Sequence, residues 1–309
     1  MSTAANPPML AVSRDEATEV PCCLLAELWQ MARPRILVMS AAAIAGGFVL
    51  ASPGPLSWLT LLVAIPAICC FVAASSVLNQ VMEYRSDREM ARTANRPVAS
   101  GRVSLLTATL FGVVLSVAGA SVLWWMVNAL TSVASFLTML SYVLVYTPLK
   151  RRSVFCTTVG AIPGAMPPVL GWFAAGGSAS VEALALFAIF FVWQFPHFLA
   201  IGWIYREQYE NAGLKMLPSY TDNGRRAGWI ALCYALAFVP VTCVPRFVGL
   251  AGPGYLSAAV VLSIGYLWLT VRFFMERSDV RARQLMVGSL ICLPVLLCCL
   301  VLDFIRLTA

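Results

Sequence analysis

Charged residues are scarce in this chain of 309 residues. Only 11% are Asp, Glu, Lys or Arg, whereas 60% are hydrophobic and the mean hydropathy is +0.83. Soluble domains carry about 25% charged residues, so an ordinary water-soluble enzyme is excluded, and a disordered chain is excluded with it. The apolar segments do not alternate as the strands of an outer-membrane barrel do. The composition therefore predicts an all-α, polytopic membrane protein.

Cysteine and histidine patterns that bind metals are also missing. The ten cysteines include no Cys-x-x-Cys pair, which leaves zinc and covalent haem attachment without support. Most of them lie in apolar runs, where a thiol behaves as a small hydrophobic group. Histidine occurs once, as His197.

Apolar runs long enough to cross a bilayer are abundant, because a spanning helix needs about 20 largely apolar residues. They predict a bundle of nine transmembrane helices with a central cavity that faces the cytoplasm. The nine runs lie near 35–52, 57–79, 104–126, 129–147, 155–176, 182–204, 227–245, 253–274 and 284–305.

The basic residues divide sharply between the two sides of these spans. They gather before span one and in the connections after spans two, four, six and eight. The connections after spans one, three and five have none, and the connection after span seven has only Arg246. The positive-inside rule then predicts a cytoplasmic N-terminus and cytoplasmic even-numbered connections. The net charge of +7 is explained by topology, and no nucleic-acid partner is expected.

The chain is expected to consist of an arm, residues 1–34, and a transmembrane domain, residues 35–309. Acidic residues in the arm argue against a secretory signal, and it lacks the character of an organellar transit peptide. A bacterial plasma (inner) membrane is therefore favoured. The stretch from Cys22 to Met31 could form a short helix in the membrane interface.

The connection after span two contains a stripe of oxygen-bearing side chains. Asn79, Glu83 and Asp87 are four residues apart, so on a helix they drift by only about 80° and face one way. Such a stripe suits Mg²⁺, and Arg92, Arg96 and Arg102 downstream suit phosphate. The alternative is a solvated helix end whose acids pair with Arg85, Arg88 or Arg92. Asn79 favours the site, because an amide in an apolar run is costly without a partner.

The connection after span six holds a second polar cluster. Glu207 and Glu210 could face the first carboxylates and hold a second metal, or could be a solvated helix end with Arg206 and Lys215. His197, inside span six and next to Pro196, is either functional or a neutral imidazole that is hydrogen-bonded at a proline kink. Three basic residues, Lys150 to Arg152, follow Tyr146 at a membrane edge, where such residues usually anchor topology.

Six motifs between residues 79 and 218 together resemble the intramembrane UbiA-type prenyltransferase superfamily, which includes the 4-hydroxybenzoate prenyltransferases. The run Trp193-Gln-x-Pro-His197-Phe is similar to the branch that farnesylates protohaem IX to make haem O. The motifs are Asn79-x3-Glu83-x3-Asp87, Arg92-Thr-x-Asn-Arg96-Pro-x3-Gly101, Tyr146-Thr-Pro-Leu-Lys150-Arg, Gly164-Ala-Met-Pro-Pro-x2-Gly171-Trp, the His197 run, and Tyr209-x2-Ala-Gly213-x2-Met216-Leu-Pro218. Two positions depart from the family pattern: Glu83 replaces an Asp, and Gln208 stands where an acid is usual.

The resemblance implies transfer of a farnesyl group from farnesyl diphosphate to a vinyl group of haem B, with Mg²⁺ as cofactor and membrane lipid as surroundings. It also implies a haem A synthase as a partner. A related enzyme acting on an aromatic acid or quinone precursor and, less favoured, a secondary transporter remain alternatives, and the oligomeric state is left open. The implied roles are catalysis and metal binding for Asn79, Glu83 and Asp87; further metal binding for Glu207 and Glu210; diphosphate binding for Arg92, Arg96, Lys150, Arg151 and Lys215; and a haem or prenyl pocket for His197, Trp193, Tyr146 and Tyr209.

Overall fold

The computed structural model describes residues 24–215, 217 and 224–308, and within this part of the chain every regular element is a helix. Ten of the elements belong to the bundle of long helices. They are α2 (Pro34–Leu50), α3 (Trp58–Glu89), α4 (Leu105–Met126), α5 (Ala129–Leu140), the π-helical turn η1 (Ser141–Tyr146), α7 (Cys156–Ala174), α8 (Val181–Ile204), α10 (Arg225–Phe247), α11 (Pro253–Met275) and α12 (Asp279–Thr308). Three short helices complete the set: α1 (Leu24–Ala32), α6 (Thr147–Leu149) and α9 (Arg206–Asn211).

The count of long apolar helices in the described residues is close to the nine expected spans. Seven continuous helices in the described residues are long and apolar enough to cross a membrane, and the bent pair of α1 and α2 adds an eighth. The expected span near 155–176 corresponds to α7, which is 19 residues long, contains three prolines and packs between α2 and α8, but does not meet the same length and hydropathy criterion. Span two is longer than expected, because α3 continues ten residues beyond residue 79 to Glu89.

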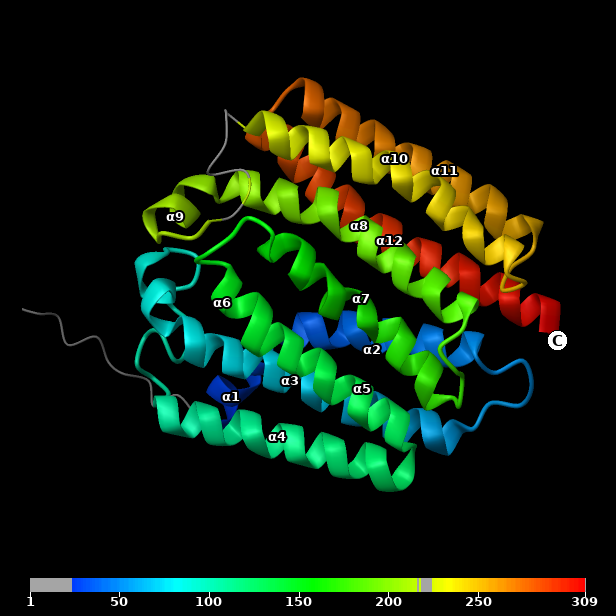
Figure 1. Cartoon of the computed structure of the whole chain (residues 1–309), viewed down its shortest axis with the longest axis horizontal. Coiled ribbons are helices and arrows are strands. Elements are labelled where there is room, and N and C mark those ends of the chain that lie inside the picture. Colours follow the sequence, from blue (N-terminus) through cyan, green and yellow to red (C-terminus); the bar gives the residue numbers. More distant parts are fainter. Residues whose placement is uncertain (1–23, 216, 218–223, 309) are drawn as a thin grey trace, which may run out of the picture.

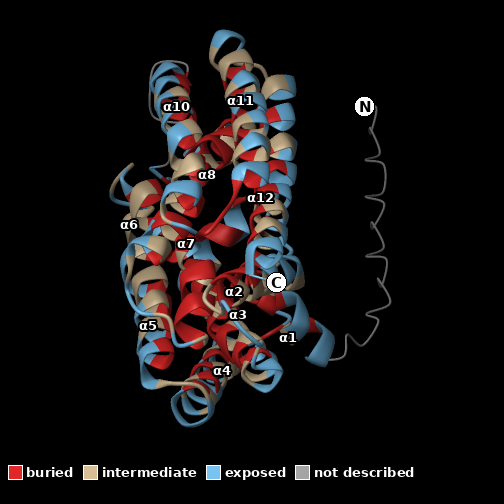
Figure 2. Ribbon diagram, turned by 90° about the vertical axis from the view of Figure 1, so that its right-hand side faces the viewer, coloured by how far each residue is buried: buried red, intermediate tan, exposed pale blue. Residues whose placement is uncertain are grey.

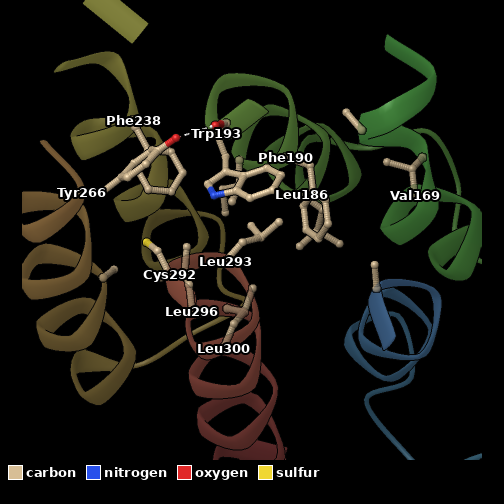
Figure 3. Packing of buried hydrophobic residues seen from close by; sticks show 14 of the residues in the cluster. Val169, Leu186, Phe190, Trp193, Phe238, Tyr266, Cys292, Leu293, Leu296 and Leu300 are labelled. Carbon is tan, nitrogen blue, oxygen red and sulfur yellow. Dashed lines mark hydrogen bonds between the residues drawn. The ribbon is translucent and has the colours of Figure 1, made fainter. Parts of the chain in front are cut away.

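The bundle has two large apolar cores, which α2 and α7 join. One core is built from α2, α3, α4, α5, η1 and α7. The other lies among α7, α8, α10, α11 and α12, where Trp193 packs near Tyr266 and Leu293 and the Tyr266 hydroxyl donates to the Trp193 carbonyl (Figure 3).

The outward faces of the helices carry large apolar side chains, which agrees with a lipid environment. Buried residues occupy the middle of the bundle, while the outer helix faces are largely exposed (Figure 2). The exposed tryptophans Trp58 and Trp125 lie at helix ends. Tryptophan is enriched at the two interfaces between membrane and water.

The N-terminal arm is described only from Leu24 onward, so Cys22, Cys23 and the rest of residues 1–23 lie outside the described part. The expected short helix corresponds to α1, which is bent by 49° from α2. Its Leu25 and Trp29 are exposed, and its Glu27 and Met31 are buried. This amphipathic face suits an interface position, which stays a prediction.

Figure 1 shows the functional connections gathered at one end of the bundle, where the loop after α3 lies with α6 and α9. The connections after α2, α4 and α10 lie at the opposite end, with the C-terminus. This separation matches the sequence prediction, in which the basic connections share one side.

Two glycines allow α2 and α7 to approach closely. A Cβ atom on Gly47 would overlap the carbonyl of Pro168, and one on Gly171 would overlap the carbonyl of Ile44. Both obstacles are backbone atoms, which cannot rotate away.

We therefore expect Gly171→Ala to lower the free energy of unfolding by about 1–3 kcal/mol, the usual cost of overpacking. Gly265→Ala on α11 is the control, because its new Cβ meets nothing within 4 Å. Thermal unfolding in detergent, followed by intrinsic fluorescence, measures both variants. Equal midpoints for the two variants would contradict the close approach.

Candidate active site at the loop end of the bundle

The stripe on α3 is confirmed as one buried face of one helix. Asn79 and Asp87 are each 1% exposed, and Glu83 is also buried. The Asn79 amide donates to the hydroxyl of Thr147 over 3.0 Å, and that hydroxyl donates to the carbonyl of Tyr142. Asn79 therefore has the partner that an amide in an apolar run requires.

Each buried carboxylate is paired with a cation from a different segment. Lys150, which follows α6, lies 2.8 Å from Glu83. Arg96, in the loop after α3, donates to both carboxylate oxygens of Asp87 over 2.9 and 2.7 Å. Arg85, Arg88 and Arg92, the partners expected for a solvated helix end, are not those found.

Arg96 is a cation held in a poorly solvated place. Burial and the nearby guanidinium of Arg33 lower the pKa of Arg96, while Asp87 and Glu83 oppose that change. Unpaired buried charges are costly, so the carboxylates and cations in this cluster depend on one another. The arrangement brings two carboxylates and two cationic side chains together at one end of the bundle.

The aromatic residues of the motif before Lys150 border this cluster. The Lys150 ammonium lies 4.5 Å from the ring centroid of Tyr146, and the Tyr146 ring lies 5.0 Å from that of Tyr142. Both tyrosines belong to η1, a π-helical turn. Such turns often mark functional sites.

Arg102 has a structural position instead of the expected phosphate-facing one. Its guanidinium lies 2.7 Å from Glu27 of α1 and also donates to the carbonyl of Asn95. Arg88 donates to the carbonyl of Ala99 in the same loop. The two arginines therefore shape the loop that presents Arg96.

The segment α9 closes over the loop after α3 through residues other than its acids. The backbone amide of Arg92 donates to the side-chain oxygen of Gln208. The guanidinium of Arg92 donates to the Tyr209 hydroxyl over 3.0 Å. Arg92 also stacks over the rings of Tyr205 and Tyr209. Gln208, which departs from the family pattern, thus contacts the loop directly.

The acids of α9 lie away from this contact. The side chain of Glu207 is 83% exposed and lies 3.9 Å from that of Arg206, and Glu210 is also exposed. Among the described residues, no three His, Cys, Asp or Glu side chains group as a metal site. The structure therefore does not bring Glu207 and Glu210 together with Glu83 and Asp87.

The other expected cations lie at the rim. Arg151 and Lys215 are exposed, and the Lys215 amide donates to the Lys150 carbonyl over 2.8 Å, which joins the α9 connection to the turn after α6. Met216 and Pro218, which end the last motif, lie outside the described residues.

His197 is buried on the α8 side of the bundle, apart from the carboxylates. Its Nδ1 lies 2.7 Å from the Ser289 hydroxyl of α12, and its ring stacks on Trp193. The Ser289 hydroxyl also donates to the Met286 carbonyl over 2.6 Å, so both contacts of this hydroxyl are satisfied when Nδ1 is the donor. In a neutral imidazole this tautomer leaves the lone pair on Nε2.

The site also depends on residues to which the sequence reading assigned no role. Thr147 holds Asn79, Ser289 sets the tautomer of His197, and Gln194 packs against Gly164. The signal for Thr147 was its place between Tyr146 and Pro148 in a motif already singled out. Ser289 is separated from His197 by 92 positions and gave no local signal.

The first cluster has the donors for a hard divalent cation. Asn79, Glu83 and Asp87 supply one amide and two carboxylates within a single buried face, and magnesium is bound by oxygen ligands. Lys150 and Arg96 now neutralise these acids. The residues therefore fit Mg²⁺ chemically.

Comparisons with known proteins agree on one family. The UbiA prenyltransferase family model matches residues 39–293. The protoheme IX farnesyltransferase of Solibacter usitatus is 40% identical and aligns with 89% of this chain and 97% of its own. The enzyme of the same name from Koribacter versatilis is 38% identical and aligns with 98% of this chain and 99% of its own.

Solved structures share the fold at low sequence identity. A digeranylgeranylglyceryl phosphate synthase has a TM-score of 0.74 at 16% identity, over 91% of this chain and 99% of that one. A UbiA homologue from Archaeoglobus fulgidus, bound to GPP and Mg²⁺, has a TM-score of 0.60 at 16% identity, over 89% of this chain and 99% of that one.

We expect Tyr209→Phe to loosen α9, because the variant keeps the ring under Arg92 but loses the hydroxyl that accepts its hydrogen bond. Hydrogen bonds to charged groups contribute about 1.5–3 kcal/mol when buried, and this partly exposed one should contribute about 1 kcal/mol. Amide hydrogen exchange over 206–211 should accelerate. Tyr205→Phe is the control, since Arg92 stacks on that ring without bonding its hydroxyl. Identical exchange in both variants would contradict the role of the Tyr209 hydroxyl.

Proposed function

The chain belongs to the UbiA prenyltransferase family, and from this premise we propose that it transfers a farnesyl group from farnesyl diphosphate to a vinyl group of haem B, giving haem O and diphosphate. The observation that carries the proposal is the similarity to protoheme IX farnesyltransferases at 38–40% identity over nearly whole chains. The buried cluster on α3 supplies the chemistry that such a transfer needs.

The diphosphate end of the donor is assigned to the cluster of Asn79, Glu83 and Asp87. The C–O bond of an allylic diphosphate breaks only if the charge developing on the leaving group is neutralised. Mg²⁺, when held by these three residues, would supply that neutralisation. Lys150 and Arg96 lie against the same carboxylates and are assigned to the phosphate oxygens, as are Arg92, Arg151 and Lys215 at the rim. The second metal site, on Glu207 and Glu210, stays a prediction.

The farnesyl end is assigned to the apolar interior beneath this cluster. An allylic cation reacts with bulk water, so the transfer needs an enclosure from which bulk water is excluded. Tyr146, which lies against Lys150, and the neighbouring Tyr142 offer ring faces that stabilise a cation. Above the cluster, the Tyr209 hydroxyl accepts from Arg92 and so joins α9 to the loop after α3.

The haem acceptor is assigned to the side of His197 and Trp193. With Nδ1 of His197 donating to Ser289, the lone pair lies on Nε2, to which we assign the haem iron, since a ligating histidine commonly donates its other nitrogen in this way. Trp193 stacks on the imidazole and limits its rotation.

The protein is a multi-pass membrane protein. We assign it to a bacterial plasma membrane with its N-terminus and active site on the cytoplasmic side, because the basic connections share the end that carries the site (Figure 1). A haem A synthase that takes up the product stays a predicted partner.

The test of this function uses membranes from cells that lack an enzyme of this kind and express the full chain. They are incubated with Mg²⁺, labelled farnesyl diphosphate and either haem B or 4-hydroxybenzoate, and the extracted products are weighed by mass spectrometry. Label in haem O alone is the expected result. Label in the benzoate would make the aromatic-acid alternative correct, and label in neither would refute prenyl transfer to both.

We expect Asp87→Asn to reduce farnesyl transfer at least about 100-fold, because it removes a charge at the point where the leaving group is neutralised. Glu89→Gln, two residues along the same helix and exposed, should keep its activity. Initial rates at saturating Mg²⁺ measure the effect, and gel filtration establishes that each variant is folded. Full activity of a folded Asp87→Asn protein would remove the metal assignment.

We expect His197→Ala to weaken the use of haem far more than that of farnesyl diphosphate, because only the haem ligand is lost. The measurements are KM for each substrate and the absorption spectrum of bound haem. Added imidazole should partly restore the spectrum. An unchanged KM for haem would leave His197 with a structural role only.

A further inference from the structure

The hydroxyl of Thr147 makes two hydrogen bonds that connect the polar stripe of α3 to the π-helical turn η1. It accepts from Nδ2 of Asn79 over 3.0 Å and donates to the carbonyl of Tyr142 over 2.9 Å. Thr147 is only 4% exposed and Asn79 only 1%. Bulk water therefore does not compete for the bond between the two side chains.

The π-helical turn changes the partner of this hydroxyl. A threonine in a regular α-helix bonds its hydroxyl to a carbonyl three or four residues back. Here the hydroxyl and the backbone amide of Thr147 both donate to Tyr142, five residues back, because η1 has the wider π-helical spacing. Pro148 favours that spacing, since in a continuous α-helix its ring would clash with the carbonyl of Leu144. The sequence Tyr-Thr-Pro thus widens the turn at the residue that contacts Asn79.

The segment that contains Thr147 lies along the stripe of α3. Thr147 bonds Asn79, and three residues later Lys150 lies 2.8 Å from Glu83, which follows Asn79 by one turn of α3. One short segment therefore contacts two successive members of the stripe. The ion pair between Lys150 and Glu83 keeps Thr147 in register with Asn79.

The contact with Thr147 also distinguishes the two ends of the Asn79 carboxamide. The Thr147 hydroxyl has one hydrogen, so both of its contacts are satisfied when Tyr142 receives that hydrogen and the NH2 group of Asn79 faces the oxygen. Among the described residues, no group donates a hydrogen bond to the carboxamide oxygen, Oδ1. Oδ1 is the atom that a hard cation would bind, because magnesium is coordinated by oxygen.

We propose that Thr147 is a positioning residue for the metal site: it holds the NH2 group of Asn79, so that Oδ1 is presented as a ligand beside Glu83 and Asp87. The inference rests on the proposed function, in which these three residues hold Mg²⁺. Groups that hydrogen-bond a metal ligand fix its orientation, and their loss typically weakens metal binding by about 10- to 100-fold. Without the hydroxyl, the carboxamide can turn over and present its NH2 group, which has no lone pair for a cation.

A purely structural hydrogen bond between α3 and η1 is the alternative, and the two roles differ in what they change. A structural bond contributes to the stability of the fold and leaves the affinity for metal unchanged. A positioning bond changes the affinity for metal, and it does so only while Asn79 is present.

The experiment measures binding of Mn²⁺ to the purified full chain in detergent, from the loss of the EPR signal of free Mn²⁺. Farnesyl thiodiphosphate, an analogue that reacts poorly, occupies the donor site, and a sample without protein corrects for the Mn²⁺ that the analogue itself binds. We expect Thr147→Val to raise the Kd for Mn²⁺ by about tenfold. Thr147→Ser keeps the hydroxyl and should restore the wild-type Kd.

Thr138→Val is the matched control, because the Thr138 hydroxyl donates to the Ala134 carbonyl of its own helix. Its Kd for Mn²⁺ should equal that of the wild type. Gel filtration and thermal unfolding establish that each variant is folded.

The variants Asn79→Ala and Asn79→Ala with Thr147→Val test whether Thr147 acts through Asn79. Once Asn79 is absent, the hydroxyl has no ligand to orient, so the second substitution should change the Kd no further. Additive effects of the two substitutions would overturn the proposal.

Two other results would also overturn it. One is an unchanged Kd in folded Thr147→Val protein, and the other is an equal change in Thr138→Val. A wild-type chain that binds no Mn²⁺ would remove the metal assignment together with this inference. A wild-type chain that binds Mn²⁺ but farnesylates no haem would refute the proposed reaction, which is a separate outcome.

Discussion

A buried negative charge needs a positive partner, and this requirement organises the functional end of the molecule. Glu83 and Asp87 lie on the inner face of α3, where solvent cannot stabilise them. Lys150 and Arg96 provide the opposing charges from the turn after α6 and from the loop after α3. Two segments that are otherwise only loops are thereby fixed over the end of the bundle. The same pairing places oxygen donors and cations side by side, as the proposed binding of a metal-bound diphosphate requires.

The surrounding connections extend this network outward. Arg102 ties the loop after α3 to Glu27 of α1, and Arg92 ties it to Tyr209 of α9. The Lys215 amide bonds the Lys150 carbonyl. Each contact joins segments that are far apart in the chain. The polar contacts over the apolar interior therefore depend on one another. Of the predicted phosphate ligands, Arg96 and Lys150 pair with the acids, whereas Arg92 and Arg102 hold the loop after α3 in place.

Beneath these contacts, the bundle separates two kinds of environment. The Tyr146 ring of η1 lies against Lys150, whereas His197 lies on the other side of α7 and contacts Ser289 of α12. The close approach of α2 and α7, which Gly47 and Gly171 permit, joins the two halves. Transfer of a group from a donor to a bulky acceptor needs two binding regions that adjoin, because each substrate is held by different side chains while the reacting atoms must meet.

The spans, the side on which the basic connections lie and the shared face of Asn79, Glu83 and Asp87 were all readable from the sequence, because hydropathy and helical periodicity are local properties. The cation opposite each acid was not, since Glu83 and Lys150 are 67 positions apart and Lys150 reads locally as a topology anchor. Periodicity could not distinguish Gln208, which contacts Arg92, from its exposed neighbour Glu207. Nor could it distinguish Thr147, which bonds Asn79 of α3, from Thr138, which bonds a carbonyl of its own helix, because the partner of a hydroxyl depends on what other helices bring to it. Local patterns determined the helices and their polar stripe, and only the packing of distant helices decided which polar groups meet.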